Sequence, residues 1–193
     1  AVTAQNILAR EALFRTGFAI NLFYLLCNIP FAVLFFDLFK GTNRTIARMM
    51  LLLIVVTTTI EAVNLFQLLT ALDYLNGTFY VGLETAQRYE LAYMSLQGFQ
   101  SGFGVSLVFF GFVCLLYGWL ILQSGLLPRI IGGLITLAGL CYLINSFALF
   151  LAPDFAASLF PFILLPSFVG ELCLALWLTV MGVNAKKWEQ AST

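Results

Sequence analysis

Residues 107–116 read LVFFGFVCLL, a run that is apolar on every side of whatever element it forms. A second run of this kind, MMLLLIVV, occupies residues 49–56. A strand of a membrane barrel would alternate apolar and polar residues with a period of two, so these runs argue against a barrel. Uninterrupted apolar runs of this length predict helices with apolar surroundings on all sides.

The composition of the whole chain agrees with these runs. Of its 193 residues, 62% are hydrophobic and 9% are charged. A soluble domain is about 45–50% apolar and about 25% charged. A chain of this size keeps a large surface, which cannot hide so many apolar side chains from water. The composition therefore excludes a water-soluble globular enzyme and predicts an integral membrane protein.

A helix needs about 20 residues to cross the hydrocarbon core of a bilayer, and five segments are long enough. We expect one all-α domain over residues 1–193, a polytopic membrane bundle. A short external amphipathic segment at residues 4–15 is expected near its start. The five expected spans are residues 14–39, 46–72, 89–122, 127–151 and 157–183.

Turn-forming residues separate the expected spans. Gly41-Thr42-Asn43 can end the first helix and cap the second, and Ser124-Gly125 with Pro128 predicts a tight turn between the third and the fourth. Pro161 and Pro166 are expected to delay the start of the fifth helix.

Basic residues predict the orientation of the bundle. If all five segments cross, six of the nine basic residues lie on one side of the membrane and three on the other. The six are Lys40, Arg44, Arg48, Arg129, Lys186 and Lys187, and the three are Arg10, Arg15 and Arg88. The positive-inside rule places the six in the cytoplasm, with the C-terminus inside and the N-terminus of this chain outside.

Two expected spans carry small residues at seven-residue spacing, which keeps them on one helix face. They are Gly104, Gly111 and Gly118 in the third span, and Gly132, Gly139 and Ser146 in the fourth. Small side chains let two helix backbones approach closely, so we expect an antiparallel hairpin with these residues at the contact. Gly98 and Gly102 add a second small-residue step. The alternative is the general frequency of glycine in membrane helices.

Polar side chains form the most specific pattern in the sequence. Counted from the expected cytoplasmic charges at about 1.5 Å per residue, five polar residues on four spans reach a similar depth of about 18–24 Å. They are Asn28, Glu61, Asn64, Asn145 and Glu171. Ionisable groups at this depth are costly, and they are candidates for function by default.

This polar layer has two interpretations. No Lys, Arg or His shares its depth, so we expect the carboxyls to be protonated and hydrogen-bonded to amides. The layer is either a small cavity that binds a headgroup, a cation or a proton, or a set of hydrogen bonds that fixes the helix register.

The remaining chemistry is limited. The chain has no histidine, so a Ser–His relay and the commonest metal ligand are missing. All four cysteines fall within expected spans, where we expect small apolar behaviour and no metal site. Thr57, Thr58 and Thr59 are expected to bond back to their own helix.

Nine basic residues balance nine acidic ones, so nucleic acid is not expected as a partner. No cofactor is predicted, and a bound lipid, quinone or pigment stays open.

Four strings in this order resemble a known family. They are GVSLVFFG at 104–111, LLPRIIG at 126–132, YLINSF at 142–147 and GELCLALW at 170–177. The chain resembles the bacterial membrane family called domain of unknown function 4386. The resemblance implies a six-span protein of the bacterial cytoplasmic membrane with no assigned activity. This sequence starts with Ala1 and corresponds to five of those spans. We therefore expect the family's first span to belong upstream of Ala1, and whether it is cleaved, unbuilt or absent stays open.

Two functional classes follow. The first is a non-enzymatic accessory or interaction subunit of a membrane assembly, with lipid, other membrane subunits or a second copy as partners. The second is a small transporter, or a protein that binds a cation or a hydrophobic ligand, with the layer of Glu61, Asn64, Asn145, Glu171 and Asn28 as its site. An enzyme is the least expected class.

Overall fold

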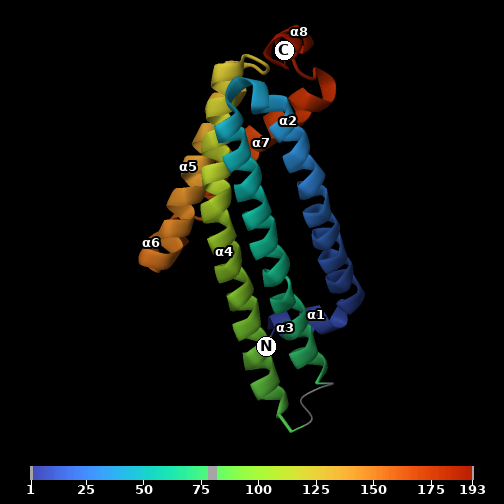
Figure 1. The fold of residues 1–193 in the computed structure, drawn as a ribbon. Helices are drawn as coiled ribbons and strands as arrows, with labels where there is room; N and C mark the ends of the chain where they lie inside the picture. Colours follow the sequence, from blue (N-terminus) through green and yellow to red (C-terminus); the bar gives the residue numbers. More distant parts are fainter. Residues whose placement is uncertain (1, 78–81, 193) are drawn as a thin grey trace. The chain divides into compact units, whose positions relative to one another are not determined.

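The computed structural model describes residues 2–77 and 82–192, and within them the chain is helical, with no strand (Figure 1). The elements are α1 (Val2–Ala9), α2 (Glu11–Asn64), α3 (Phe66–Asn76), α4 (Thr85–Ser124), α5 (Arg129–Leu151), α6 (Pro153–Leu159), the 3₁₀ helix η1 (Phe162–Leu164), α7 (Leu165–Val180) and α8 (Ala185–Ser192).

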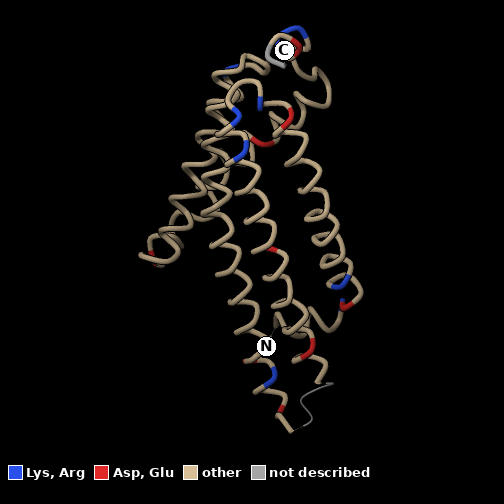
Figure 2. Tube along the Cα trace, viewed as in Figure 1, with Lys and Arg blue, Asp and Glu red and all other residues tan. Residues whose placement is uncertain are grey.

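Four helical stretches among these residues are long and apolar enough to cross a membrane. They are Glu11–Asn76, Thr85–Ser124, Arg129–Leu151 and Phe162–Val180. Figure 2 shows that charged residues are sparse along the helices and gather near turns and helix ends. The first stretch, at 66 residues, contains the first two expected spans, at 14–39 and 46–72.

Asn43 interrupts α2 at the place where the sequence predicts a turn. Its backbone angles are φ −156° and ψ 102°, outside the helical region. Its side-chain Oδ1 accepts a hydrogen bond of 3.0 Å from the backbone N–H of Ile46, three residues later. This is the geometry of an N-cap, so the predicted capping role is confirmed. Figure 1 shows the chain reversing at this point of α2.

A second interruption, at Leu65, was not predicted. The sequence suggests an unbroken helix to residue 72, but α2 ends at Asn64 and α3 begins at Phe66. Leu65 keeps helical angles and donates its N–H to the carbonyl of Glu61 at 3.0 Å. Its own carbonyl accepts from Leu68, a tighter three-residue step. The irregularity is therefore local and leaves the chain helical on both sides.

The chain divides into two compact units, which we describe separately. Unit 1 comprises the described parts of Ala1–Asn28 and Thr58–Phe103, and unit 2 comprises the described parts of Ile29–Thr57 and Gly104–Thr193. Residues of α2 and of α4 therefore contribute to both units.

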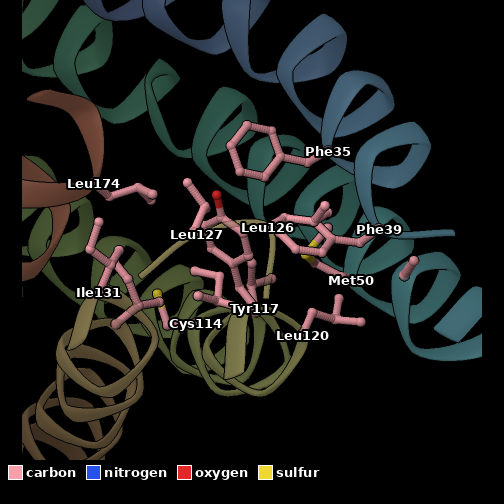
Figure 3. Packing of buried hydrophobic residues seen from close by; sticks show 14 of the residues in the cluster. Phe35, Phe39, Met50, Cys114, Tyr117, Leu120, Leu126, Leu127, Ile131 and Leu174 are labelled. Atoms are coloured by element: carbon pink, nitrogen blue, oxygen red, sulfur yellow. The ribbon is translucent and has the colours of Figure 1, made fainter. Parts of the chain in front are cut away.

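Unit 2 has an apolar core that Figure 3 shows from close by. The α2 hairpin supplies Phe35, Phe39 and Met50, and the other labelled side chains come from α4, the turn after it, α5 and α7. The Tyr117 ring meets Phe35 and Phe39 edge to face, with ring centroids 4.8 and 5.5 Å apart. Leu126 and Leu127, in the turn between α4 and α5, belong to the same core. The core therefore holds the turn at residue 43 and the turn at 125–128 at one end of this unit.

The predicted turn between α4 and α5 is present. Gly125 has φ +63°, and the Ser124 hydroxyl accepts a hydrogen bond of 3.2 Å from the N–H of Leu126. Pro128 precedes the first residue of α5. The left-handed conformation at Gly125 explains why glycine stands there.

The last long helix starts later than the expected position of residue 157. The short helix α6 ends at Leu159, η1 follows Pro161, and α7 begins at Leu165 with Pro166 in its first turn. Proline lacks the N–H that an interior helical position must donate, and the first turn tolerates it. The late start agrees with the delay that these two prolines predict.

Unit 1 contains a smaller apolar core. Ala4 of α1 packs with Ala71 and Leu75 of α3 and with Ala92 of α4. Within the segment expected to be an amphipathic helix at 4–15, α1 ends at Ala9 and α2 begins at Glu11. The apolar side of α1 is therefore used to contact α3 and α4.

Candidate functional site

Unit 1 holds a small pocket between polar and apolar side chains. Its volume is about 40 Å³, enough for a water molecule or a small cation. Two of its residues, Glu61 and Asn64, belong to the predicted polar layer. The complete lining is Asn21, Leu25, Glu61, Asn64, Leu65, Phe99 and Phe103.

Asn64 is held by the facing part of α4. Its side-chain Nδ2 donates a hydrogen bond of 2.8 Å to the backbone carbonyl of Phe99. This approach requires glycine at 102, because a Cβ there would collide with the Asn64 amide. One turn earlier on α4, a Cβ at Gly98 would lie 3.3 Å from the side-chain amide carbon of Gln67. Gly98 and Gly102 thus lie against the polar side chains of Gln67 and Asn64.

Glu61 and Asn21 supply the other polar groups of this pocket. Glu61 is half-buried and lies one turn before Asn64, immediately ahead of the irregularity at Leu65. Asn21, one turn before Leu25 on the first half of α2, donates its Nδ2 to the carbonyl of Gly17 at 2.9 Å. A carboxyl and two amides provide oxygen atoms, the ligands that hard cations and water prefer.

Unit 2 contains the other carboxyl of the predicted layer. Glu171 of α7 is half-buried, and its Oε1 accepts a hydrogen bond of 2.7 Å from the hydroxyl of Tyr142 on α5. Ser167 donates to the backbone carbonyl of Ala138 at 3.2 Å. A Cβ at Gly170 would lie 2.9 Å from the carbonyl oxygen of Leu134. Three successive contacts therefore fix α7 on α5, and Glu171 bonds to a phenol where an amide was expected.

The predicted polar layer is thus distributed between the units. Glu61 and Asn64 share a pocket in unit 1, whereas Asn145 and Glu171 lie in unit 2. Asn145 is half-buried, and its amide has no hydrogen-bond partner among the described residues. Asn28, also half-buried, belongs to unit 1 but does not line the pocket of Glu61. A single site formed by all five residues stays a prediction.

The small residues at seven-residue spacing lie between α4 and α5. A Cβ at Gly118 would lie 2.8 Å from the carbonyl oxygen of Gly132, and one at Gly139 would lie 2.7 Å from that of Gly111. Ser146 is fully buried. At the end of this series, a Cβ at Gly104 would lie 2.7 Å from the side chain of Leu149.

Two residues of these sites escaped the sequence analysis. Asn21 carries no local signal, because it lies 40 positions before Glu61. Tyr142 could have been found, since it lies 13 residues after Arg129, at about 20 Å from the expected cytoplasmic charges, close to the depth of Glu171.

One expectation about hydroxyl groups is wrong. Thr57 and Thr58 were expected to bond back to their own helix, but neither Oγ1 has a hydrogen-bond partner among the described residues. Both side chains are buried. A Thr hydroxyl bonds to its own helix only in suitable side-chain rotamers, and the sequence does not specify the rotamer.

Metal-ligating side chains do not gather in the described parts of the chain, where no group of three or more His, Cys, Asp or Glu could hold a metal ion. Neither a curated protein nor a solved structure matches the sequence. Residues 1–182 match a protein family described as "Domain of unknown function (DUF4386)". The match covers the α4–α5 hairpin, both polar sites and all four long apolar stretches, and the chain therefore belongs to this family.

Proposed function

We propose that the protein is a non-enzymatic integral membrane protein of the bacterial cytoplasmic membrane, an accessory or interaction subunit of a membrane assembly. Large apolar side chains along its helices are exposed, for example Phe23 and Leu34, at 68% and 66%. In water such a surface would drive aggregation, so it needs lipid or protein cover. The four long apolar stretches support the same environment.

The observation that carries the accessory role is how the polar groups within these helices are used. Asn64 bonds to the carbonyl of Phe99, and Glu171 bonds to Tyr142. Each bond joins two helices of the same unit. Interhelical hydrogen bonds of this kind stabilise a membrane bundle by about 0.6–2 kcal/mol each. Polar groups that join helices of the same chain have a structural role, which agrees with a non-enzymatic subunit.

The orientation we propose places the C-terminus of this chain in the cytoplasm and its N-terminus outside. Contacts within unit 2 support one cytoplasmic end. The N–H of Asn184 bonds to the carbonyl of Leu126 at 3.0 Å, and Lys187 lies against Gly125. The C-terminal basic residues therefore lie beside the turn that precedes Arg129. All six basic residues of the expected cytoplasmic side belong to unit 2.

A second candidate function is the binding of a small cation or a proton at Glu61. The pocket of about 40 Å³ with Asn21 and Asn64 favours it, because these side chains offer oxygen ligands in a space of suitable size. Transport would require such a site to be reached from both faces of the membrane.

The accessory role is tested by purifying the protein from its native membrane in a mild detergent. We expect a complex of fixed stoichiometry with other membrane subunits, identified by mass spectrometry and sized by light scattering. Recovery of a monodisperse single chain, from membranes and after chemical cross-linking before solubilisation, would contradict the accessory role.

The two candidates differ in their response to Glu61→Gln. Glutamine still accepts hydrogen bonds, so the accessory role predicts an unchanged complex. Cation binding predicts that Na⁺ or K⁺ raises the unfolding temperature of the parent protein and not that of Glu61→Gln. The matched control is Glu171→Gln, which changes a carboxyl outside the pocket. Equal cation effects in all three proteins would remove the second candidate.

A further inference from the structure

Unit 1 contains a second and larger cavity, formed by α1, α3 and α4. Its volume is about 460 Å³, within the range of about 300–1,000 Å³ that is usual for small-molecule sites. None of its lining residues lines the pocket of Glu61. Its lining includes Thr3 and Ile7 of α1, Leu75 of α3, and Tyr89, Glu90 and Tyr93 of α4.

Small side chains explain why a space exists here. Ala4 and Ala92 also line the cavity, and both are buried in the apolar core of unit 1. At these positions the helices meet through methyl groups, which leaves room beside the larger side chains. The packing of Ala4 against α3 and α4 holds α1 as one wall of the cavity.

Among the described lining residues, Glu90 carries the carboxyl group, and the other polar side-chain groups are the hydroxyls of Thr3, Tyr89 and Tyr93. Glu90 contributes a carboxylate, and Tyr89 and Tyr93 contribute aromatic rings from the same stretch of α4. Glu90 has no ion pair or hydrogen bond with its side chain among the described residues. Arg88, the nearest basic residue on α4, contacts Gly77 and donates its Nη2 to Thr85. The Glu90 charge is therefore available to a ligand.

A carboxylate beside aromatic rings is the arrangement that recognises an ammonium group, through charge and cation–π attraction. The rest of the wall, including Ile7, Leu75 and Leu96, is apolar. We propose that this cavity binds a molecule with an ammonium group on an apolar body. An aminophospholipid and a soluble arylalkylamine share this chemistry. The proposal goes beyond the function proposed above and depends on neither Glu61 nor a partner subunit.

The soluble source is tested with the full chain in a maltoside detergent, with 2-phenylethylammonium as the probe and neutral 2-phenylethanol as the charge control. Binding is measured by saturation-transfer NMR. The lipid source is tested by native mass spectrometry after addition of dioleoylphosphatidylethanolamine or dioleoylphosphatidylglycerol. Four proteins are compared: the parent, Glu90→Gln, Thr3→Trp and Glu84→Gln. Thr3 is exposed, so tryptophan can fill the cavity without disturbing the core.

We expect at least one ammonium ligand to bind, and its affinity to fall about tenfold in Glu90→Gln. Thr3→Trp should block binding, and Glu84→Gln, which changes an exposed carboxyl outside the cavity, should not alter it. Thermal unfolding checks that all four proteins are folded. Retention of phosphatidylethanolamine alone identifies a lipid site, and binding of 2-phenylethylammonium alone identifies a soluble amine. Binding of neither ligand, or equal binding by the parent and Glu90→Gln, overturns the proposal.

Discussion

Asn64 combines burial with a hydrogen bond to another helix, and this makes its replacement informative. In Asn64→Leu the carbonyl of Phe99 loses the bond from Nδ2, and a branched side chain must fit against Gly102. We expect the free energy of unfolding to fall by about 1–2 kcal/mol, measured by denaturant titration in mixed micelles. Asn145→Leu is the control, because the Asn145 amide bonds to no described residue. An equal effect of both changes would show that the bond contributes nothing.

Tyr142 and Glu171 allow the same question to be asked in unit 2. Tyr142→Phe removes the hydroxyl that bonds to Glu171 at 2.7 Å, and we expect a loss of about 1 kcal/mol in unfolding free energy. Glu171→Gln keeps an acceptor oxygen and should cost less. A double-mutant cycle of Tyr142→Phe with Glu171→Leu, which removes the acceptor, isolates the coupling between the two side chains. Additive effects would mean that the bond is not formed in the membrane protein.

Single residues also show what sequence reasoning could and could not predict. The depth count singled out Asn64 and Glu171 because charge and rise per residue are local quantities, and the structure gives each side chain a hydrogen bond to another helix. It did not find Asn21, whose meeting with Glu61 depends on how distant segments pack. Tyr142 lies at a similar depth by the same count, but a hydropathy pattern does not mark the hydroxyl of an aromatic side chain as a polar partner.

At the scale of elements, the contact between α4 and α5 should be sensitive to one methyl group. In Gly118→Ala the new Cβ would lie 2.8 Å from the carbonyl oxygen of Gly132, so the helices must separate. We expect a loss of about 1–3 kcal/mol in unfolding free energy. Gly133→Ala is the matched control, since nothing lies within 4 Å of a Cβ at that position. Thermal unfolding of both variants in detergent makes the comparison, and similar midpoints would contradict close packing.

The cap at Asn43 offers a test of the α2 reversal. Asn43→Ala removes the acceptor of the Ile46 N–H, and we expect a cost of about 1 kcal/mol. Hydrogen exchange of the amides at 44–47 should accelerate. Thr42→Ala, one residue earlier, has no described side-chain bond to lose and should leave this exchange unchanged. Unchanged exchange in Asn43→Ala would contradict the capping role.

Some turns and helix ends have a cause in the local sequence, and one helix irregularity does not. The turns at Asn43 and at Gly125 follow from residues that favour them, and the late start of α7 follows from prolines. The irregularity at Leu65 contains neither glycine nor proline. It lies beside the bond from Asn64 to α4, a tertiary contact that no sequence window reveals.

For the whole molecule, the proposed orientation predicts which loops can be labelled. In a chain with its four cysteines replaced by alanine, Glu84→Cys should react with a membrane-impermeant maleimide in intact spheroplasts. Thr42→Cys should react only after the membrane is permeabilised, because the basic residues around it are proposed to be cytoplasmic. The reverse pattern would invert the orientation, and equal labelling of both positions would place them on one side.

The helical class of the molecule was predictable because it depends on composition, which needs no knowledge of contacts. The division into two compact units was not, since its boundaries, after Asn28, Thr57 and Phe103, fall inside the helices α2 and α4, where the chain stays helical.

The late start of α7 has a consequence for the bilayer that surrounds the protein. The apolar stretch Phe162–Val180 has 19 residues, about 28 Å of helix, against a hydrocarbon thickness of about 30 Å. The 40 residues of α4 extend about 60 Å. A long helix adapts to a thicker membrane by changing its tilt, whereas a short one has no length in reserve and thins the lipid around it. Hydrophobic mismatch should therefore act first at α7, and short-chain lipids should stabilise the protein more than long-chain ones.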